Sequence, residues 1–145
     1  MQKNKTSALS CTLNSQCDCI NVLRSIVEVV ASRAKLDPIE VNRMVLAVDE
    51  LFANISEHGY GDKPGIIEMS AAMEQTKLCF EFRDFASPIR DKNCLQGRDL
   101  DDIRPGGLGL HLISSVMDET FHEALNDGNR WVLTRYLSVK EHDLA

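Results

Sequence analysis

The sequence has no run of about 20 apolar residues, the length that an α-helix needs to cross a bilayer. Residues 1–19 hold two lysines but no apolar segment of the kind that marks a signal peptide. An excess of basic residues is also missing, since the net charge is −6 and the isoelectric point is about 5.2. Nucleic acid and anionic membranes bind basic patches, so we expect neither as the main partner. These absences predict a cytoplasmic protein.

A zinc-binding cysteine pattern is absent as well. The five cysteines are odd in number, and Cys17 and Cys19 are separated by one residue instead of the usual two. No later Cys/His pair completes a site. We therefore expect reduced thiols, without a disulfide framework or a structural metal.

The chain is long enough to bury a core. Its 145 residues are 43% hydrophobic and 26% charged, which is typical of one globular domain. We expect a single domain over 1–145, with a core at about 15–137 and mobile termini.

Hydrophobic periodicity predicts a helix from 18 to about 34 and a second from 38 to about 58. Asp37 is a good N-cap, Pro38 suits the first helical position, and Glu40 completes a capping box. Gly59 and Gly61 mark the end of the second helix. Its apolar stripe comprises Val41, Met44, Val45, Val48, Leu51, Phe52 and Ile55.

Strands are expected at 8–13, 65–73, 77–84, 119–125 and 130–138, with a third helix at 110–117. In 77–84, apolar and polar residues alternate, which is typical of a sheet covered on one face only. The predicted fold class is α+β, a two-layer sandwich with helices on one face of a mixed, mostly antiparallel sheet.

Glu50 and Asn54 lie one turn apart on the second helix, opposite its apolar stripe, with Ala47 beside them. An isolated Glu-x-x-x-Asn is usually no more than a solvated face. In a site, the Asn54 amide oxygen suits Mg²⁺, and Glu50 could accept a proton from a hydroxyl.

Asp84 ends the strand at 77–84, where an aspartate most often starts a turn. In a nucleotide site, its carboxylate would accept a hydrogen bond from the exocyclic amine of adenine. Guanine presents a carbonyl at that position, so the acid would be left without a donor.

A glycine-rich segment, Arg104-Pro105-Gly106-Gly107-Leu108-Gly109, leads into the third helix. It could be a hinge, or it could bring backbone N–H groups close to phosphates. It is not a P-loop, because no Gly-Lys-Ser/Thr follows, and no strand directly precedes it as in a dinucleotide fingerprint.

Together and in this order, the three motifs resemble the N, G1 and G2 boxes of the ATP-binding fold shared by gyrase, heat-shock chaperone, histidine kinase and mismatch-repair ATPases (GHKL superfamily). Within it, VDELFANISEHGYG and RPGGLGLHLISSVMDE look like segments of the bacterial anti-sigma factor serine/threonine-protein kinases. The resemblance covers about 15–137. The chain departs from the family pattern in two places: Ala86 replaces a glycine, and Asn129-Arg130-Trp131 replaces a Gly-Thr-Thr-like segment.

The resemblance implies a Bergerat (histidine kinase-like ATPase) fold that binds ATP and Mg²⁺. Glu50 would be the catalytic base, Asn54 the Mg²⁺ ligand, and Asp84 the adenine reader. The other implied cofactor-binding residues are His58, Ala86, Arg104, Gly106, Gly107, Leu108 and Gly109.

The function implied by the resemblance is that of an ATP-dependent protein-serine kinase and anti-sigma factor. It would phosphorylate a STAS-domain antagonist and bind a sigma factor in a partner-switching system, and a homodimer is plausible. The alternative is a non-catalytic or weakly ATP-binding module of the same fold that sequesters a regulatory protein. A histidine kinase domain ranks lower, because the first helix is short and lacks histidine, and a gyrase-like ATPase ranks lower still.

Overall fold

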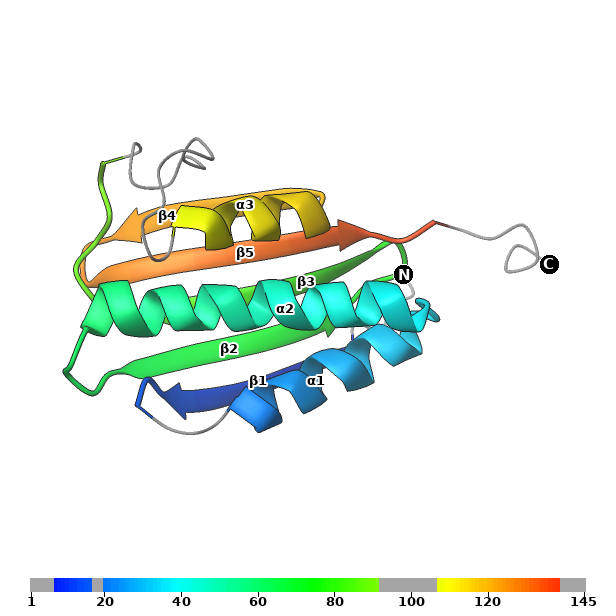
Figure 1. The fold of residues 1–145 in the computed structure, drawn as a ribbon, viewed down its shortest axis with the longest axis horizontal. Coiled ribbons are helices and arrows are strands. Elements are labelled where there is room, and N and C mark those ends of the chain that lie inside the picture. The colour runs from blue at the N-terminus through cyan, green and yellow to red at the C-terminus, as the bar shows by residue number, and fades with distance from the viewer. Residues whose placement is uncertain (1–6, 17–19, 92–106, 139–145) are drawn as a thin grey trace, which may run out of the picture.

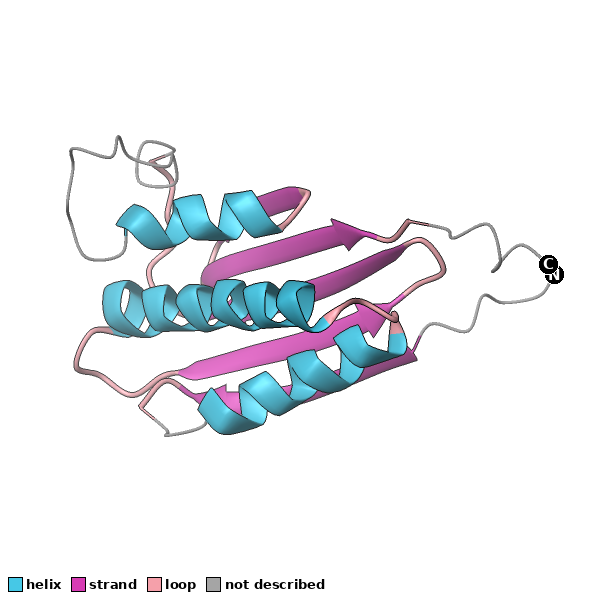
Figure 2. Ribbon diagram, turned by 45° about the vertical axis from the view of Figure 1, so that its right-hand side comes forward, coloured by secondary structure: helices cyan, strands magenta, loops and turns pink. Residues whose placement is uncertain are grey.

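The computed structural model describes residues 7–16, 20–91 and 107–138 of the chain. Within them, three α-helices and one π-helical turn cover one face of a five-stranded sheet (Figures 1 and 2). None of these helices is long and apolar enough to span a membrane. The elements are β1 (Ser7–Asn14), α1 (Ile20–Arg33), α2 (Pro38–Asn54), η1 (Ile55–Tyr60), β2 (Ile66–Met73), β3 (Lys77–Asp84), α3 (Gly107–Val116), β4 (Glu119–Leu125) and β5 (Gly128–Tyr136).

The strand order is β1-β2-β3-β5-β4, and every pair of neighbours is antiparallel. The predicted α+β sandwich with helices on one face is confirmed. Among the described strands the sheet is wholly antiparallel instead of mixed. Hairpins join β2 to β3 and β4 to β5, and α3 returns the chain so that β5 pairs antiparallel with β3.

Helix α2 begins where its sequence predicts, although the Glu40 side chain bonds to Arg135 instead of completing the capping box. The Asp37 side chain accepts a hydrogen bond of 2.9 Å from the backbone N–H of Glu40, and Pro38 is the first helical residue. This cap satisfies one of the donors that a helix start leaves free. The start of the helix is therefore set by local chemistry alone.

The apolar stripe of α2 packs into the core between the sheet and the two other helices, as predicted for all but its first residue, Val41, which is half-buried. Ala47 is 0% exposed, however, so the expectation that it lies on the outer face beside Glu50 is wrong. Arg135 of β5 donates to Glu40 and to the carbonyl of Val116 at the end of α3, which shows that α3 lies along this flank of α2. Ala47 lies two turns beyond Glu40 on the same flank and is covered for that reason.

The sheet contributes its helix-facing side chains to the same core. Leu78, Phe80 and Phe82 of β3 are fully buried, while the residues between them are half-buried on the opposite face. Strand β5 starts at Gly128, two residues before the predicted start. A Cβ at Gly128 would lie 2.0 Å from the carbonyl oxygen of Asp84, so this close approach of β5 to β3 requires glycine.

Tyr60 connects η1 to the sheet through two hydrogen bonds. Its hydroxyl donates to the carbonyl of Ile66 at 2.6 Å and accepts from the N–H of Phe85 at 2.7 Å. The ring lies so close to Gly65 that a Cβ there would come within 2.2 Å of it. One side chain thus joins the start of β2 to the segment that follows β3.

We expect Tyr60→Phe to lower the free energy of unfolding by about 1–3 kcal/mol, because a backbone donor and acceptor lose their partner. Urea denaturation measures the change. The chain's other tyrosine supplies a matched control: Tyr136 is 49% exposed and its hydroxyl donates to Glu119, so Tyr136→Phe should leave stability nearly unchanged. Equal effects of the two substitutions would contradict the proposed role of Tyr60.

The Tyr60 hydroxyl also predicts that the stability of the folded chain depends on pH. Burial, mainly, raises the pKa of Tyr60 above its ordinary value of 10.0, so the folded chain retains the phenol proton longer than the unfolded chain does. The stability that Tyr60 contributes is therefore full below pH 10 and is lost as pH rises through the folded pKa. The difference in stability between wild type and Tyr60→Phe should narrow above pH 10.

Candidate functional site

Four parts of the chain come together at one end of the molecule. The C-terminal end of α2, the end of β3, the start of β5 and the N-terminus of α3 all lie on the left in Figure 1. The three sequence motifs are carried by these elements. The fold therefore brings the first two motifs and the described part of the third, 107–109, to the same end of the molecule.

Glu50 and Asn54 are half-buried on the last turns of α2. Within the described residues Glu50 makes no hydrogen bond or ion pair, so its carboxylate is available to a ligand. The Asn54 side-chain nitrogen is buried and has no acceptor in the part of the chain that the structure describes. Asp49 and Ser56 hold the other two buried side-chain atoms without a partner, so all three such atoms of the described chain lie between residues 49 and 56.

The helix was expected to continue regularly to Gly59, but it changes at Ile55 into the π-helical turn η1. Such wide turns often occur at functional sites. In a π turn the backbone bonds join residues five apart instead of four, so the helix is wider here. His58 is exposed on η1, and its place beside the phosphates stays a prediction.

Asp84 is 1% exposed, and its carboxylate accepts three hydrogen bonds. Trp131 donates its indole N–H to Oδ2 at 2.8 Å, and Asn129 donates its amide to Oδ1 at 2.9 Å. The backbone N–H of Ala86 donates to Oδ1 at 3.1 Å. These donors compensate the burial of a charged group, which would otherwise be costly.

Asn129 is the residue that sequence reasoning missed. Its Nδ2 also donates to the carbonyl of Ser87 at 3.1 Å, and its Oδ1 accepts from the N–H of Ile89 and from His122 Nε2, both at 2.8 Å. Because Nδ2 faces two acceptors, Oδ1 must accept, and His122 therefore carries its proton on Nε2. A signal was present in the alternation of β5, which places Asn129 on the same buried face as Trp131.

Ala86 occupies the position where the family pattern has glycine. Within the described chain, positive φ angles occur only at Lys35 and Gly61, so Ala86 adopts an ordinary backbone conformation. It is 7% exposed and packs against Gly59, where an added Cβ would lie 3.1 Å from the Ala86 Cβ. The methyl group is thus accommodated by a glycine on η1.

The glycine-rich segment is described only in part. Helix α3 begins at Gly107 and includes Leu108 and Gly109, so the predicted helix starts three residues earlier than expected. The N-terminus of α3 lies at the same end of the molecule as the end of β3 (Figure 1), and a helix N-terminus favours negative charge. Arg104 and Gly106 lie outside the described residues.

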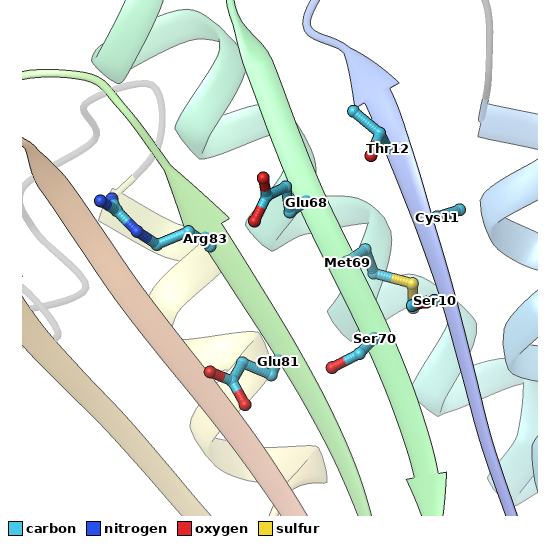
Figure 3. A pocket seen from close by; sticks show the side chains of 8 residues that line it. All are labelled: Ser10, Cys11, Thr12, Glu68, Met69, Ser70, Glu81 and Arg83. Carbon is cyan, nitrogen blue, oxygen red and sulfur yellow. The ribbon is translucent and has the colours of Figure 1, made fainter.

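A hollow of about 560 Å³ lies on the face of the sheet opposite the helices. Figure 3 shows its polar side chains on β1, β2 and β3, among them Glu68, Glu81 and Arg83. Glu68 alternates with buried Ile67 and Met69, so it points away from the helices. This hollow is separated from the candidate site by the sheet.

Comparison with known proteins agrees with the fold and the motifs. The family model described as the histidine kinase-like ATPase domain matches residues 13–135. Serine-protein kinase RsbW of Halalkalibacterium halodurans is 24% identical over 99% of this chain and 91% of its own length. Serine-protein kinase RsbW of Listeria monocytogenes is 28% identical over 77% of this chain and 76% of its own.

Among solved structures, the RsbU and RsbW domains of a Mycobacterium tuberculosis protein match with a TM-score of 0.63 and 19% identity. The match covers 90% of this chain but only 32% of that longer chain. At this identity the likeness establishes the fold.

The hydrogen bonds of Asp84 predict that Asp84→Asn lowers the free energy of unfolding by about 1–3 kcal/mol without any ligand. An amide nitrogen would replace one carboxylate oxygen and would then face a donor from Trp131 or Asn129. Urea denaturation measures the change, with Glu50→Gln as the control, since Glu50 has no partner among the described residues. Unchanged stability of Asp84→Asn would contradict the hydrogen-bond assignment.

Proposed function

Since this chain belongs to the histidine kinase-like ATPase family and has RsbW serine-protein kinases among its relatives, we propose that it is an ATP-dependent protein-serine kinase. The observation that carries the proposal is the buried Asn54 amide, which has no acceptor among the described residues, one turn from the Glu50 carboxylate, which has no partner among them. An unsatisfied buried donor costs about 1–3 kcal/mol, so it indicates a group that the bare chain does not supply. A phosphate oxygen is such a group.

The residues present fit a bound Mg-ATP. No cluster of three or more acidic, histidine or cysteine side chains in the described chain could hold a metal by itself. Mg²⁺ needs few protein ligands when phosphates and water supply the others, and the Asn54 side chain provides an oxygen as well as the orphaned nitrogen. We assign Asn54 to the metal and phosphates, Asp84 to adenine, and the N-terminus of α3 to the phosphates.

ATP would supply the γ-phosphoryl group, and the leaving ADP would keep the bond electrons. Glu50 would take the proton of the substrate serine hydroxyl as the serine oxygen bonds to phosphorus. Near the end of α2, Glu50 has no ion pair with any residue that the structure describes, so its carboxylate would be available for this transfer. The three donors to Asp84 keep the base-reading group fixed while the phosphate end reacts.

For the substrate we propose a serine of a STAS-domain antagonist, and for the regulated partner a sigma factor. RsbW-like relatives support this choice. Phosphate on the antagonist adds about −2 charge and can release it by repulsion. Sigma factors act in the cytoplasm, where the proposed function would place this chain.

The catalytic assignment predicts that Glu50→Gln transfers phosphate from Mg-ATP to an antagonist at least about 100-fold more slowly than wild type, the usual scale of general-base catalysis. The assay uses radiolabelled ATP and a panel of STAS-domain proteins from the same genome. Glu57→Gln, a carboxylate on the exposed side of η1, is the matched control and should retain activity. Phosphorylation by Glu50→Gln at the wild-type rate would exclude Glu50 as the base.

Asn54→Ala gives a second prediction with a separate readout. Without ligand the variant should be as stable as wild type or more stable, because it removes an unsatisfied buried amide and alanine favours helix. Mg-ATP at about 100 times its dissociation constant should stabilise wild type by about 2.7 kcal/mol and the variant much less. Thermal unfolding measures both effects, and equal stabilisation of the two proteins would remove Asn54 from the site.

One observation favours the second candidate function, a module that sequesters a regulatory partner with little or no ATP. Asp84 is 1% exposed and already accepts three hydrogen bonds from the chain itself. A carboxylate with only a structural role would have the same burial and the same hydrogen bonds. Wild-type protein that is not stabilised by Mg-ATP, yet binds a sigma factor, would establish this alternative.

A further inference from the structure

Asn129 and Trp131 fix the orientation of the Asp84 carboxylate, and we propose that this fixed orientation makes the site select adenine over guanine. The inference rests on the proposed function, since it concerns the base of the bound nucleotide. It assigns positioning roles to two residues of β5, at the place where the sequence departs from the family pattern. Neither residue is assigned to the phosphates or to proton transfer.

The first step is a count of acceptor positions on the carboxylate. A carboxylate offers about four, two on each oxygen. Oδ1 is filled by Asn129 and by the N–H of Ala86, and Oδ2 accepts from Trp131. The described residues therefore leave one position, on Oδ2. A single donor fits there, and the exocyclic amine of adenine is one.

The second step concerns rotation. A carboxylate that could turn or shift would also serve guanine, because guanine carries N–H donors at N1 and N2 next to its carbonyl. A carboxylate held with its free position opposite the six-substituent meets that carbonyl instead, and acceptor faces acceptor. Discrimination thus depends on how firmly the carboxylate is held, as well as on its presence.

The third step is how strongly Asn129 and Trp131 restrict the Asp84 carboxylate. Asn129 is 1% exposed and uses all four of its hydrogen-bonding positions, on Asp84, Ser87, Ile89 and His122. It cannot turn away from Asp84 without breaking the others, which also anchor the segment after β3. On the other oxygen, the Trp131 ring packs against His122 with centroids 4.3 Å apart, so the indole N–H is fixed too.

The strand register places these partners opposite one another. Asp84 of β3 pairs with Asn129 of β5, and Trp131 of β5 pairs with His122 of β4. The contacts that fix the Asp84 carboxylate therefore involve three strands, and they do not depend on the bound phosphates. A change in base selectivity with intact phosphate binding is the signature that a merely structural role would not produce.

The test is calorimetric titration of the full chain with Mg²⁺ complexes of non-hydrolysable ATP and GTP analogues. Trp131→Phe keeps the ring and removes the N–H, and Asn129→Ser shortens the other donor. We expect both to reduce the ATP:GTP affinity ratio by about tenfold or more, the scale of one lost buried hydrogen bond. Tyr136→Phe removes an exposed hydroxyl from the same strand and should keep the wild-type ratio.

A titration of wild type with the triphosphate of purine riboside, which lacks the six-amine, tests the free position without any substitution. Binding about tenfold weaker than that of ATP is expected. Failure of wild type to bind any nucleotide defeats the proposed function itself. Equal affinity of wild type for ATP and for purine riboside triphosphate overturns the inference but not the proposed function. An ATP:GTP affinity ratio that is unchanged in a β5 variant also overturns the inference. Circular dichroism shows which of the two β5 variants is folded and can be used.

Discussion

The buried carboxylate of Asp84 is the constraint on which this end of the molecule depends. A charge that is 1% exposed must be met by donors, and the chain supplies them from β5 and from the backbone that follows β3. Those donors fix the course of the segment through Ser87 and Ile89, both of which bond to Asn129. Under the proposed function, stability and base recognition would therefore use the same atoms.

The C-terminal end of α2 shows the reverse arrangement. Asn54 and Ser56 keep buried polar atoms without partners, and Glu50 has no counter-charge in the described chain. Evolution seldom retains such groups unless function requires them, because they lower stability. The site therefore joins a side with one open acceptor position, where a base would be read, to a side with unsatisfied groups, where charge would be handled.

The sequence predicts those features that depend on neighbouring residues. The cap at Asp37 is a contact between residues three apart, and the bounds of β3 follow from alternation within eight residues. Features set by distant parts of the chain were not predicted. Ala47 is buried by α3, η1 is stabilised through Tyr60, and the start of β5 at Gly128 follows from the approach of Asp84. From the sequence, Asn129 lies between two predicted strands and is expected to be a turn residue. No neighbouring residue in the sequence shows that Asn129 lies opposite a buried acid.

Trp131 is the single tryptophan of the sequence, and its N–H lies 2.8 Å from the oxygen of Asp84. The emission of an indole responds to the charge and polarity around that nitrogen. All tryptophan fluorescence of this protein therefore comes from one point in the candidate site. The unlabelled chain carries its own optical reporter, and stopped-flow measurements could follow the arrival and departure of a nucleotide or a partner in real time.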